Sequence, residues 1–377
     1  MAAGGTAGHV VPAMAVAAEL RASGAEVSFL GARDKPEAEL VPRAGCEIDL
    51  LDVRGIDRRN PLRAAVALGK ALGGIRDARQ VLRGRRADVV LGGGGYVAGT
   101  AGMAAVLSRV PLVLTEADSH LGLANRVLAR RARRVCLSFP IAGREGGRYL
   151  ITGRPVPGAV LGADRTAARA RFGISAEERC LLVMGGSQGA RSVNLAAIEA
   201  FAETGDADQR DFHVLHLSGS RDHAELAARL ASAPHAGRYT LIEYEPDLGD
   251  VLAACDLVVA RSGGSIFEVT AAGRPAILVP YPYATADHQT ANAAWMAEAG
   301  AAETIEDTTL SAGLLAQRVG GLLRDEERLA EMSRASAALA RPDAAKRIAD
   351  EVLAAAGAAT PSGAPYVPME SKRRTAT

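Results

Sequence analysis

The sequence has few cysteines and no long apolar segment. The four cysteines, Cys46, Cys136, Cys180 and Cys255, lie far apart and form no C-x-x-C pair, which argues against a disulfide framework. We expect them to be small buried residues of a reducing compartment. No apolar run approaches the roughly 20 residues of a membrane-spanning helix, and the start lacks the basic and apolar regions of a signal peptide. These absences predict a soluble, cytosolic protein.

An excess of charge of one sign is also missing. The chain has 44 basic and 43 acidic side chains, a formal charge of +1, so a general nucleic-acid-binding function is not expected. The G-x-G-x-x-G fingerprint is not matched by residues 4–9, and no G-x-x-x-x-G-K-[ST] phosphate loop occurs. Dinucleotide binding and ATP hydrolysis therefore have no signature.

No metal cluster can be recognised in the sequence. Residues 206–208 read Asp-Ala-Asp, which mimics a metal-binding D-x-D, but they lie in a polar stretch that predicts a solvated loop. His213 and His216 are three apart on a predicted strand and so point to opposite faces. We expect no metal and no cofactor.

Short apolar runs alternate with helical patterns along the 377 residues, which are 48% hydrophobic. Strands buried on both faces and separated by helices predict a parallel α/β sheet, built twice. A segment rich in glycine and proline at 152–165 divides the two halves. Strands are predicted at 25–31, 46–53, 87–93, 110–116, 133–139, 180–186, 212–218, 239–244, 256–261 and 275–281. Helices are predicted at about 12–22, 61–86, 98–108, 120–132 and 310–356.

The first glycine-rich turn begins at Gly4, with only Met1, Ala2 and Ala3 before it. Such a turn normally follows a strand. Either that strand is missing from this chain or the first sheet lacks its central strand. We expect truncation, because loss of a central strand is costly.

Four glycine clusters occur where a strand meets a helix, at 3–9, 92–99, 184–190 and 261–268. Glycine lets a ligand approach the bare backbone, and the following helix offers unpaired N–H groups and a positive dipole end to an anion. A single such loop is often only a packing necessity. Four loops across two domains predict an anion-binding cleft.

The motifs occur together in a recognisable order: GGTAGH (4–9), GGGGYVAG (92–99), GLANRVLARRARRV (122–135), MGGSQGARSVN (184–194), ARSGGSIFE (260–268) and ADHQTANA (286–293). In this combination the chain resembles the MurG family, over about residues 2–356. That family transfers N-acetylglucosamine from UDP-N-acetylglucosamine to undecaprenyl-pyrophosphoryl-muramoyl-pentapeptide, lipid I, in peptidoglycan synthesis, forming lipid II.

The resemblance implies the GT-B fold, in which two Rossmann-like domains face each other across a cleft. It places the lipid I acceptor on residues 1–157 and the UDP-sugar on residues 158–340. Residues 341–356 are expected to form a helix that packs back on the first domain, and residues 357–377 a disordered tail. The implied enzyme is an inverting hexosyltransferase bound peripherally to the cytoplasmic face of the cell membrane.

Residues of the UDP-sugar site follow from the same motifs. The backbone amides of the 184–190 loop and the Ser187 hydroxyl suit the diphosphate, whose charge grows as the sugar bond breaks. Glu268 can accept both ribose hydroxyls, and the resemblance gives Gln289 the hydroxyls of N-acetylglucosamine. For Glu268 and Gln289, an ordinary helix start is the competing interpretation. The full predicted set is Thr6, Ala7, Gly8, Gly186, Ser187, Gln188, Gly189, Ser262, Gly263, Gly264, Glu268, Gln289 and Asn292.

His9 is the predicted general base. It follows the first glycine loop and titrates near neutral pH, so it can accept the proton of the attacking muramoyl 4-hydroxyl. A helix-capping or phosphate-contacting role is the competing interpretation. Asp118 is a second candidate. The predicted acceptor-binding residues are Gly4, Gly5, Gly94, Gly95, Tyr96, Asn125 and Arg154.

The chain departs from the family at three places, of which one is the stretch from Arg261 to Glu268, shorter by one residue than in many relatives. It has TEADSH (115–120) where the family usually has His-Glu-Gln-Asn, so Asp118 replaces an amide near the acceptor. It has GRPVP (153–157) where the family has GNPVR, so Pro157 stands in the arginine's place and Arg154 is the available substitute. These differences concern contacts within the site more than the activity.

Membrane contact has two open interpretations. The arginine-rich segment 54–86 suits a helix lying on an anionic leaflet, or a solvated helix packed on the sheet. Two rival functions also stay open. One is a UDP-sugar transferase with another lipid or natural-product acceptor. The other is a catalytically inactive sugar-nucleotide-binding homologue.

Overall fold

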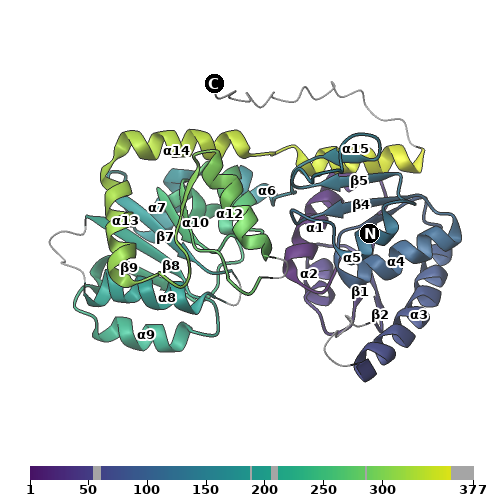
Figure 1. Ribbon diagram of the computed structural model, residues 1–377, viewed down its shortest axis with the longest axis horizontal. Helices are drawn as coiled ribbons and strands as arrows, with labels where there is room; N and C mark the ends of the chain where they lie inside the picture. The colour runs from purple at the N-terminus through teal and green to yellow at the C-terminus, as the bar shows by residue number, and fades with distance from the viewer. Residues whose placement is uncertain (54–60, 187–188, 205–210, 285–286, 358–377) are drawn as a thin grey trace, which may run out of the picture.

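The computed structural model describes residues 1–53, 61–186, 189–204, 211–284 and 287–357, with residues 7 and 61–72 described by their backbone alone. Figure 1 shows two lobes side by side, the first half of the chain in one and most of the second half in the other. Each lobe is a parallel sheet covered by helices, which the alternation of short apolar runs and helical patterns dictates.

In the first lobe, β3, β4, β5 and β6 pair in that order, and β1 pairs with β2. The strands are β1 (Ser28–Ala32), β2 (Glu47–Leu51), β3 (Val90–Gly92), β4 (Leu112–Glu116), β5 (Arg134–Leu137) and β6 (Tyr149–Ile151). The helices are α1 (Ala7–Ala22), α2 (Glu37–Arg43), α3 (Pro61–Gly84), α4 (Gly95–Ser108) and α5 (Leu123–Leu128).

The first three residues join the two parts of this sheet. Ala2 forms parallel bridges to Leu30 on one side and to Gly92 on the other. The Met1 carbonyl accepts from the Leu30 N–H at 2.7 Å, and the Ala2 N–H donates to the Leu91 carbonyl at 2.8 Å. Residues 1–3 therefore occupy the central position where the sequence predicts a strand before the glycine-rich turn.

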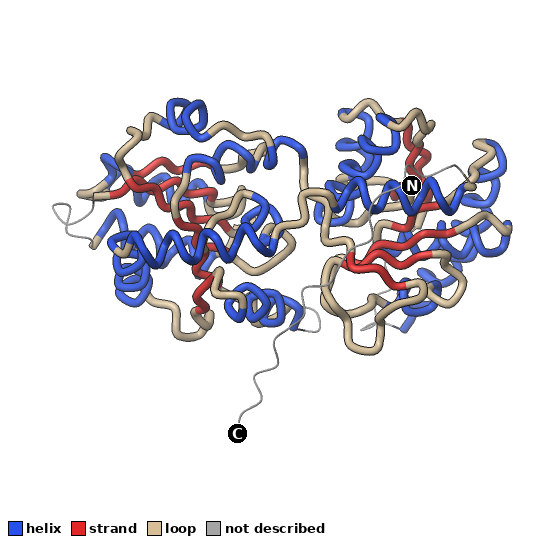
Figure 2. The backbone as a smooth tube through the Cα atoms, turned by 90° about the horizontal axis from the view of Figure 1, so that it is seen from above, coloured by secondary structure: helices blue, strands red, loops and turns tan. Residues whose placement is uncertain are grey.

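In the second lobe six parallel strands run in the order β12-β11-β10-β7-β8-β9. They are β7 (Arg179–Met184), β8 (Phe212–Leu217), β9 (Tyr239–Ile242), β10 (Leu257–Ala260), β11 (Ala276–Leu278) and β12 (Ala302–Thr304). The helices are α6 (Gly158–Leu161), α7 (Arg165–Phe172), α8 (Arg191–Ile198), α9 (His223–Ser232), α10 (Leu248–Ala254), α11 (Ile266–Ala271), α12 (His288–Glu298), α13 (Ala312–Arg324) and α14 (Glu326–Leu339). A π-helical turn (Glu199–Glu203) extends α8, and a 3₁₀ turn (Ala236–Arg238) precedes β9. Figure 2 shows the strands enclosed by helices, which is why their central positions are uniformly apolar.

The chain crosses between the lobes twice, from β6 to α6 and from α14 to α15 (Ala344–Ala356). After the second crossing α15 packs on α1, where Ile348 and Val352 join Val16 and Leu20 in one buried cluster. Figure 1 shows α15 lying on the first lobe. The domain limits at residues 157 and 340 stay a prediction.

The predicted two-sheet α/β fold is confirmed, and the differences are local. The sequence analysis missed α2, β6 and β12, because each is short and carries no long apolar run. The prediction that all four cysteines are buried is wrong for Cys46, which is partly exposed. The other three cysteines are buried, and all four are free thiols. The predicted tail, from residue 358 on, and the Asp-Ala-Asp motif at 206–208 lie outside the described residues.

Candidate functional site

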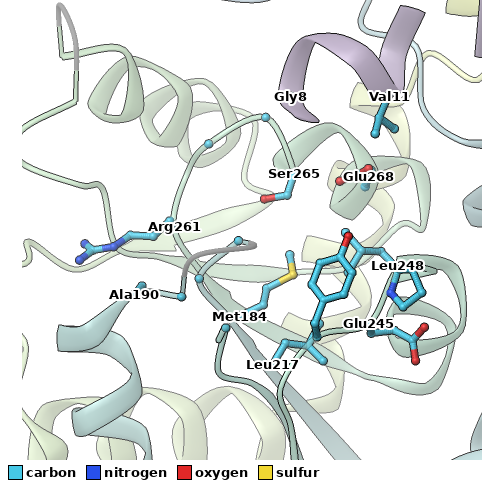
Figure 3. A pocket seen from close by; sticks show the side chains of 18 of the residues that line it. Gly8, Val11, Met184, Ala190, Leu217, Glu245, Leu248, Arg261, Ser265 and Glu268 are labelled. Carbon is cyan, nitrogen blue, oxygen red and sulfur yellow. The ribbon is translucent and has the colours of Figure 1, made fainter. Parts of the chain in front are cut away.

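A cavity of about 950 Å³ lies between the two lobes. It is lined by loops that follow β6, β7, β8, β9 and β10 and by the start of α1. Figure 3 shows Gly8 and Val11 of α1 on one side of it and Met184 and Leu217 of the second lobe on the other. The carboxyl ends of parallel strands are where open α/β folds bind ligands. This cavity is therefore the candidate site.

The glycine-rich turn after β7 forms one wall. Gly186 and Gly189 have positive φ values of 80° and 75°. A Cβ atom on Gly189 would lie 2.1 Å from the Ser218 carbonyl oxygen, so only glycine permits this close packing of two backbones. The turn delivers the chain to α8, and the first two residues of that helix, Arg191 and Ser192, line the cavity. Ser187 and Gln188, both predicted to bind the UDP-sugar, lie outside the described residues.

A buried chain of hydrogen bonds supports this turn from below. Asn194 donates to the Ser218 carbonyl at 2.8 Å and to Asp222 at 2.9 Å, and its Oδ1 lies 3.0 Å from Nε2 of His216. The other ring nitrogen of His216 lies 2.6 Å from the Tyr239 hydroxyl. Burial lowers the pKa of His216 to about 3. The ring is therefore neutral, with Nε2–H donating to Asn194 and Nδ1 accepting from Tyr239.

A second wall is built by the turn after β10 and the start of α12. Ser262 donates to the Gln289 carbonyl at 2.7 Å, and Asn292 donates to the Ser262 carbonyl at 2.9 Å. The side-chain oxygen of Gln289 accepts from the Tyr281 N–H at 3.0 Å. Ser262 and Asn292 are buried and hold this turn in place, whereas Gly263, Gly264 and Gln289 line the cavity.

Glu268 lies in the first turn of α11 and lines the cavity. Burial raises the pKa of its carboxyl to about 7, and the neighbouring Arg154 opposes that rise. At neutral pH the group is therefore partly protonated, which is unusual for a glutamate and typical of functional sites.

The first glycine turn is held by an acidic residue that the sequence analysis missed. The buried carboxylate of Glu37 accepts from the Gly5 N–H at 3.1 Å and from the Ala32 N–H at 3.0 Å. The Tyr96 ring packs against Gly5, and its buried hydroxyl has no partner among the described residues. The Gly5 amide is therefore already occupied, while the Tyr96 hydroxyl is an unpaired polar group in the predicted acceptor region.

His9 lies beside this turn. Its Nδ1 forms a hydrogen bond of 3.0 Å with the Thr6 hydroxyl. A Cβ atom on Gly94 would lie 2.5 Å from the imidazole, so the glycine at 94 makes room for the ring. Burial lowers the pKa of His9; Arg154 lowers it further, and Asp118 and Glu37 raise it. A lowered pKa keeps the imidazole neutral at pH 7, the form that accepts a proton.

A smaller space, of about 20 Å³, is lined by His9 and Glu116 and shares Gly8, Pro12, Arg154 and Pro155 with the large cavity. His9 itself does not line the large cavity in the part of the chain that the structure describes. The predicted base thus lies directly behind the wall that Gly8 and Arg154 form.

Glu116 orders the loop after β4. Its carboxylate accepts from the Gly122 N–H at 2.8 Å, from Asn125 at 2.9 Å and from the Asp118 N–H at 3.3 Å. Burial raises the pKa of Glu116, and the three hydrogen bonds oppose the rise. Asn125 also donates to the Thr115 carbonyl. Its amide is thus committed to the loop, and only its side-chain oxygen lacks a partner among the described residues.

Comparison with known proteins identifies the fold and the family. Residues 1–137 match the glycosyltransferase family 28 N-terminal domain and residues 180–348 its C-terminal domain. A UDP-N-acetylglucosamine–N-acetylmuramyl-(pentapeptide) pyrophosphoryl-undecaprenol N-acetylglucosamine transferase of Moorella thermoacetica is 40% identical, over 93% of this chain and 96% of that protein. This chain belongs to that transferase family, the MurG family.

Solved structures agree. The crystal structure of Acinetobacter baumannii MurG is 29% identical, has a TM-score of 0.72 and covers 93% of this chain and 97% of that one. The predicted GT-B fold is thereby confirmed. A UDP-GlcNAc 2-epimerase from Neisseria meningitidis, bound to UDP-GlcNAc, has a TM-score of 0.65 at 14% identity, over 93% of this chain and 98% of that one. At that identity the likeness shows the fold alone.

Within this family member, the predicted residues divide into two groups. The large cavity is lined by Gly8, Gly186, Gly189, Gly263, Gly264, Glu268, Gln289 and Arg154. The described residues of the predicted set that do not line it are Gly4, Gly5, Thr6, His9, Gly94, Gly95, Tyr96, Asp118, Asn125, Ser262 and Asn292. Only the backbone of Ala7 is described. The individual roles of all these residues stay predictions.

Sequence reasoning missed three arginines of the cavity wall. Arg191 pairs with Asp222 at 3.2 Å and with Glu225 at 2.7 Å. Arg221 pairs with Asp222 at 2.9 Å, and Arg261 pairs with Asp307 at 2.6 Å. The MGGSQGAR and ARSGGSIFE motifs already contained Arg191 and Arg261, but no motif in the sequence indicates that Arg221 reaches the same space.

The described residues hold no group of three or more His, Cys, Asp or Glu side chains arranged to bind a metal ion. Over the same residues, no helix has the length and apolar character needed to cross a membrane.

Proposed function

We propose that the protein transfers N-acetylglucosamine from UDP-N-acetylglucosamine to the muramoyl 4-hydroxyl of lipid I, forming lipid II in peptidoglycan synthesis. The observation that carries this proposal is the 40% identity to a transferase of that activity over nearly the full length of both chains. The cavity between the lobes, with a glycine-rich turn on each side, is the place for the reaction.

The chemistry that suits this arrangement is a single inverting displacement. His9, held through Nδ1 by Thr6, accepts the proton of the 4-hydroxyl at Nε2. The hydroxyl oxygen forms a bond to the anomeric carbon, and the bond from that carbon to the β-phosphate oxygen breaks. The electron pair of the broken bond leaves with UDP, so negative charge accumulates on the diphosphate.

We propose that this charge is met by protein groups without a divalent cation. The first N–H groups of α8 are hydrogen-bond donors at a positive helix end. Because the buried chain through Asn194 and Ser218 holds the turn in place, these donors need no reorganisation when the charge appears.

An assay with the purified protein tests both proposals. We expect UDP release and a disaccharide-linked lipid from UDP-N-acetylglucosamine and a lipid I analogue, at the same rate with EDTA as with magnesium. Release of UDP only with another lipid or natural-product acceptor would support that rival. No release with any acceptor, despite UDP-sugar binding, would support an inactive homologue. A rate that vanishes with EDTA and returns with magnesium would contradict the metal-free proposal alone.

We further propose that the protein binds peripherally to an anionic membrane at the cytoplasmic face, where its acceptor lies. Helix α5 exposes Leu123 (53%) and Val127 (57%), one turn apart, beside the exposed Arg126, Arg130 and Arg131. Apolar side chains surrounded by arginines suit an anionic interface.

The sequence predicted that the segment 54–86, which includes helix α3, contacts the membrane. From residue 73 on, where its side chains are described, α3 packs against the first lobe instead. Ala78 and Leu82 are buried in the core of the first lobe, and Arg79 donates to Ser108. Residues 54–60 lie outside the described residues. The membrane proposal therefore rests on α5.

A further inference from the structure

Arg154 lies in the crossing segment between the two lobes, directly after two residues whose backbone is hydrogen-bonded to β5. Thr152 and Gly153 both donate to the Leu137 carbonyl, at 3.0 and 3.2 Å. Pro155 follows directly, which favours an extended backbone at Arg154. A side chain that starts from this fixed position can reach either lobe.

The guanidinium of Arg154 contacts both lobes at once. It donates to the Gly8 carbonyl of α1 at 2.5 Å. A Cβ atom on Gly264 would lie 2.6 Å from its terminal nitrogen, so the guanidinium lies directly over that turn of the second lobe. Its central carbon lies 5.9 Å from the centre of the Phe267 ring. Arg154 therefore stands where α1 faces the turn that follows β10.

Charge pairing separates Arg154 from the other arginines of the cavity. Arg191, Arg221 and Arg261 each form an ion pair with a carboxylate within 3.2 Å. Among the described residues, Arg154 forms no ion pair within 4.0 Å, and its guanidinium donates to a backbone carbonyl, that of Gly8. It is thus the cavity arginine whose charge the protein leaves least neutralised.

Two acidic groups act on Arg154 from a greater distance. Burial lowers the pKa of its guanidinium, while Glu268 and Asp118 raise it. Since burial also raises the pKa of Glu268 to about 7, that carboxyl carries only part of a negative charge at neutral pH. A half-buried cation that is incompletely balanced favours an anionic ligand.

We propose that Arg154 is a catalytic residue that binds the diphosphate of the departing UDP. This inference rests on the proposed transfer reaction. As the bond between the anomeric carbon and the β-phosphate oxygen breaks, the electron pair stays on that oxygen, and the guanidinium donates to the growing charge. Two diphosphates enter the reaction, that of the sugar nucleotide and that of the lipid acceptor. The position of the guanidinium over Gly264, in the turn beside Glu268, favours the nucleotide.

Binding without any acceptor separates the two sources. We expect Arg154→Gln to weaken UDP binding about ten- to a hundredfold in calorimetry, the range for loss of one charge-assisted hydrogen bond, and to leave uridine binding unchanged. Arg154→Lys should recover part of the affinity. Arg318→Gln, which removes an exposed arginine of α13 from its pair with Glu303, is the matched control. Thermal melting of each variant verifies folding.

Turnover gives the second readout. We expect Arg154→Gln to lower kcat at saturating concentrations of both substrates. Gly264→Ala should also reduce UDP affinity, because its methyl group displaces the guanidinium. The two substitutions together should reduce the binding free energy by less than the sum of their separate effects.

Wild-type UDP affinity in a folded Arg154→Gln protein, with only a raised KM for the acceptor, would overturn the inference in favour of the acceptor pyrophosphate. Unchanged affinity and unchanged kcat would overturn it outright. If instead the wild type binds UDP but transfers no sugar to lipid I, the proposed function fails while the binding result still stands.

Discussion

His9 lies at the amino end of α1 between groups of opposite influence. Burial and Arg154 lower the pKa of its imidazole, and Asp118 and Glu37 raise it, with the net effect a decrease. A general base works in its unprotonated form, so a lowered pKa extends its working range toward lower pH. The ring is thus prepared for proton acceptance at neutral pH.

We therefore expect the acidic limb of the kcat profile to lie below the ordinary histidine value of about 6.5. His9→Ala should lower kcat by about 10²- to 10⁴-fold and remove that limb, with little change in the affinity for UDP-N-acetylglucosamine. Steady-state rates across pH and calorimetry measure the two effects. Nearly full turnover of His9→Ala would contradict the assignment, and loss of the same limb in Asp118→Asn would transfer it to Asp118.

Glu268 is expected to make binding of the sugar nucleotide depend on pH. Its pKa is raised to about 7 by burial, and only the ionised carboxylate accepts hydrogen bonds from both ribose hydroxyls. Affinity for UDP-N-acetylglucosamine should therefore increase from about pH 6 to about pH 8. Glu268→Gln should bind more weakly and show a flat profile over that range. An equal pH dependence in the variant would place the titrating group elsewhere.

Among the elements, β8 and α8 show how a buried polar chain supports the cavity wall. Tyr239, His216 and Asn194 form a directional series of hydrogen bonds that ends on Ser218 and Asp222. Each member is buried, so every donor and acceptor needs its partner. The turn that carries Gly189 rests on this series through the Ser218 carbonyl.

Asn194→Ala is expected to lower the free energy of unfolding by about 1–3 kcal/mol, because it leaves buried polar groups unpaired. It should also weaken UDP binding, since the turn loses its support. Chemical denaturation and calorimetry check the two effects. The matched control is His213→Gln at the start of β8, where the ring lies beside Thr240. If Asn194→Ala bound UDP with wild-type affinity, the turn would keep its conformation without the hydrogen bonds of Asn194.

At the scale of the whole molecule, the residues proposed to bind the acceptor and the exposed face of α5 belong to the same lobe. Asn125, on the buried side of α5, contacts Glu116 at the end of β4, and Glu116 and His9 line the same small space. Leu123 and Val127 on the same helix are exposed. A lipid-linked acceptor that reaches His9 would therefore come from a surface close to α5.

We expect co-sedimentation with vesicles that contain phosphatidylglycerol, weaker binding to purely neutral vesicles, and a loss of binding as salt increases. Replacing Leu123 and Val127 by Ser should reduce vesicle binding and leave UDP binding intact. Leu161→Ser removes an exposed leucine from α6 in the other lobe and serves as the control. Equal vesicle binding by the double variant would exclude α5 as the contact surface.

Much of the fold follows from local patterns. The buried strands β7, β8 and β10 are continuous apolar runs, and each was predicted to within two residues at its ends. Helix α2 and the short strands β6 and β12 were missed because they have no long apolar run of their own and are stabilised by their neighbours. Glu37 and Glu116 were missed for a related reason: a single acidic residue in a sequence does not show that its carboxylate turns inward to backbone amides.

By itself the sequence determined the chemistry of the turns and the two-sheet architecture, because glycine position and apolar periodicity act over a few residues. It also indicated the family through the order of its motifs. Only the tertiary structure decided which charges share the cavity. Arg154, Arg191, Arg221 and Arg261 are far apart along the chain, and their pairing depends on where β6, β7, β8 and β10 end. Which charges of the site neutralise each other depends on the distances between their side chains. Those distances are set only when both sheets have formed and the crossing segment connects them.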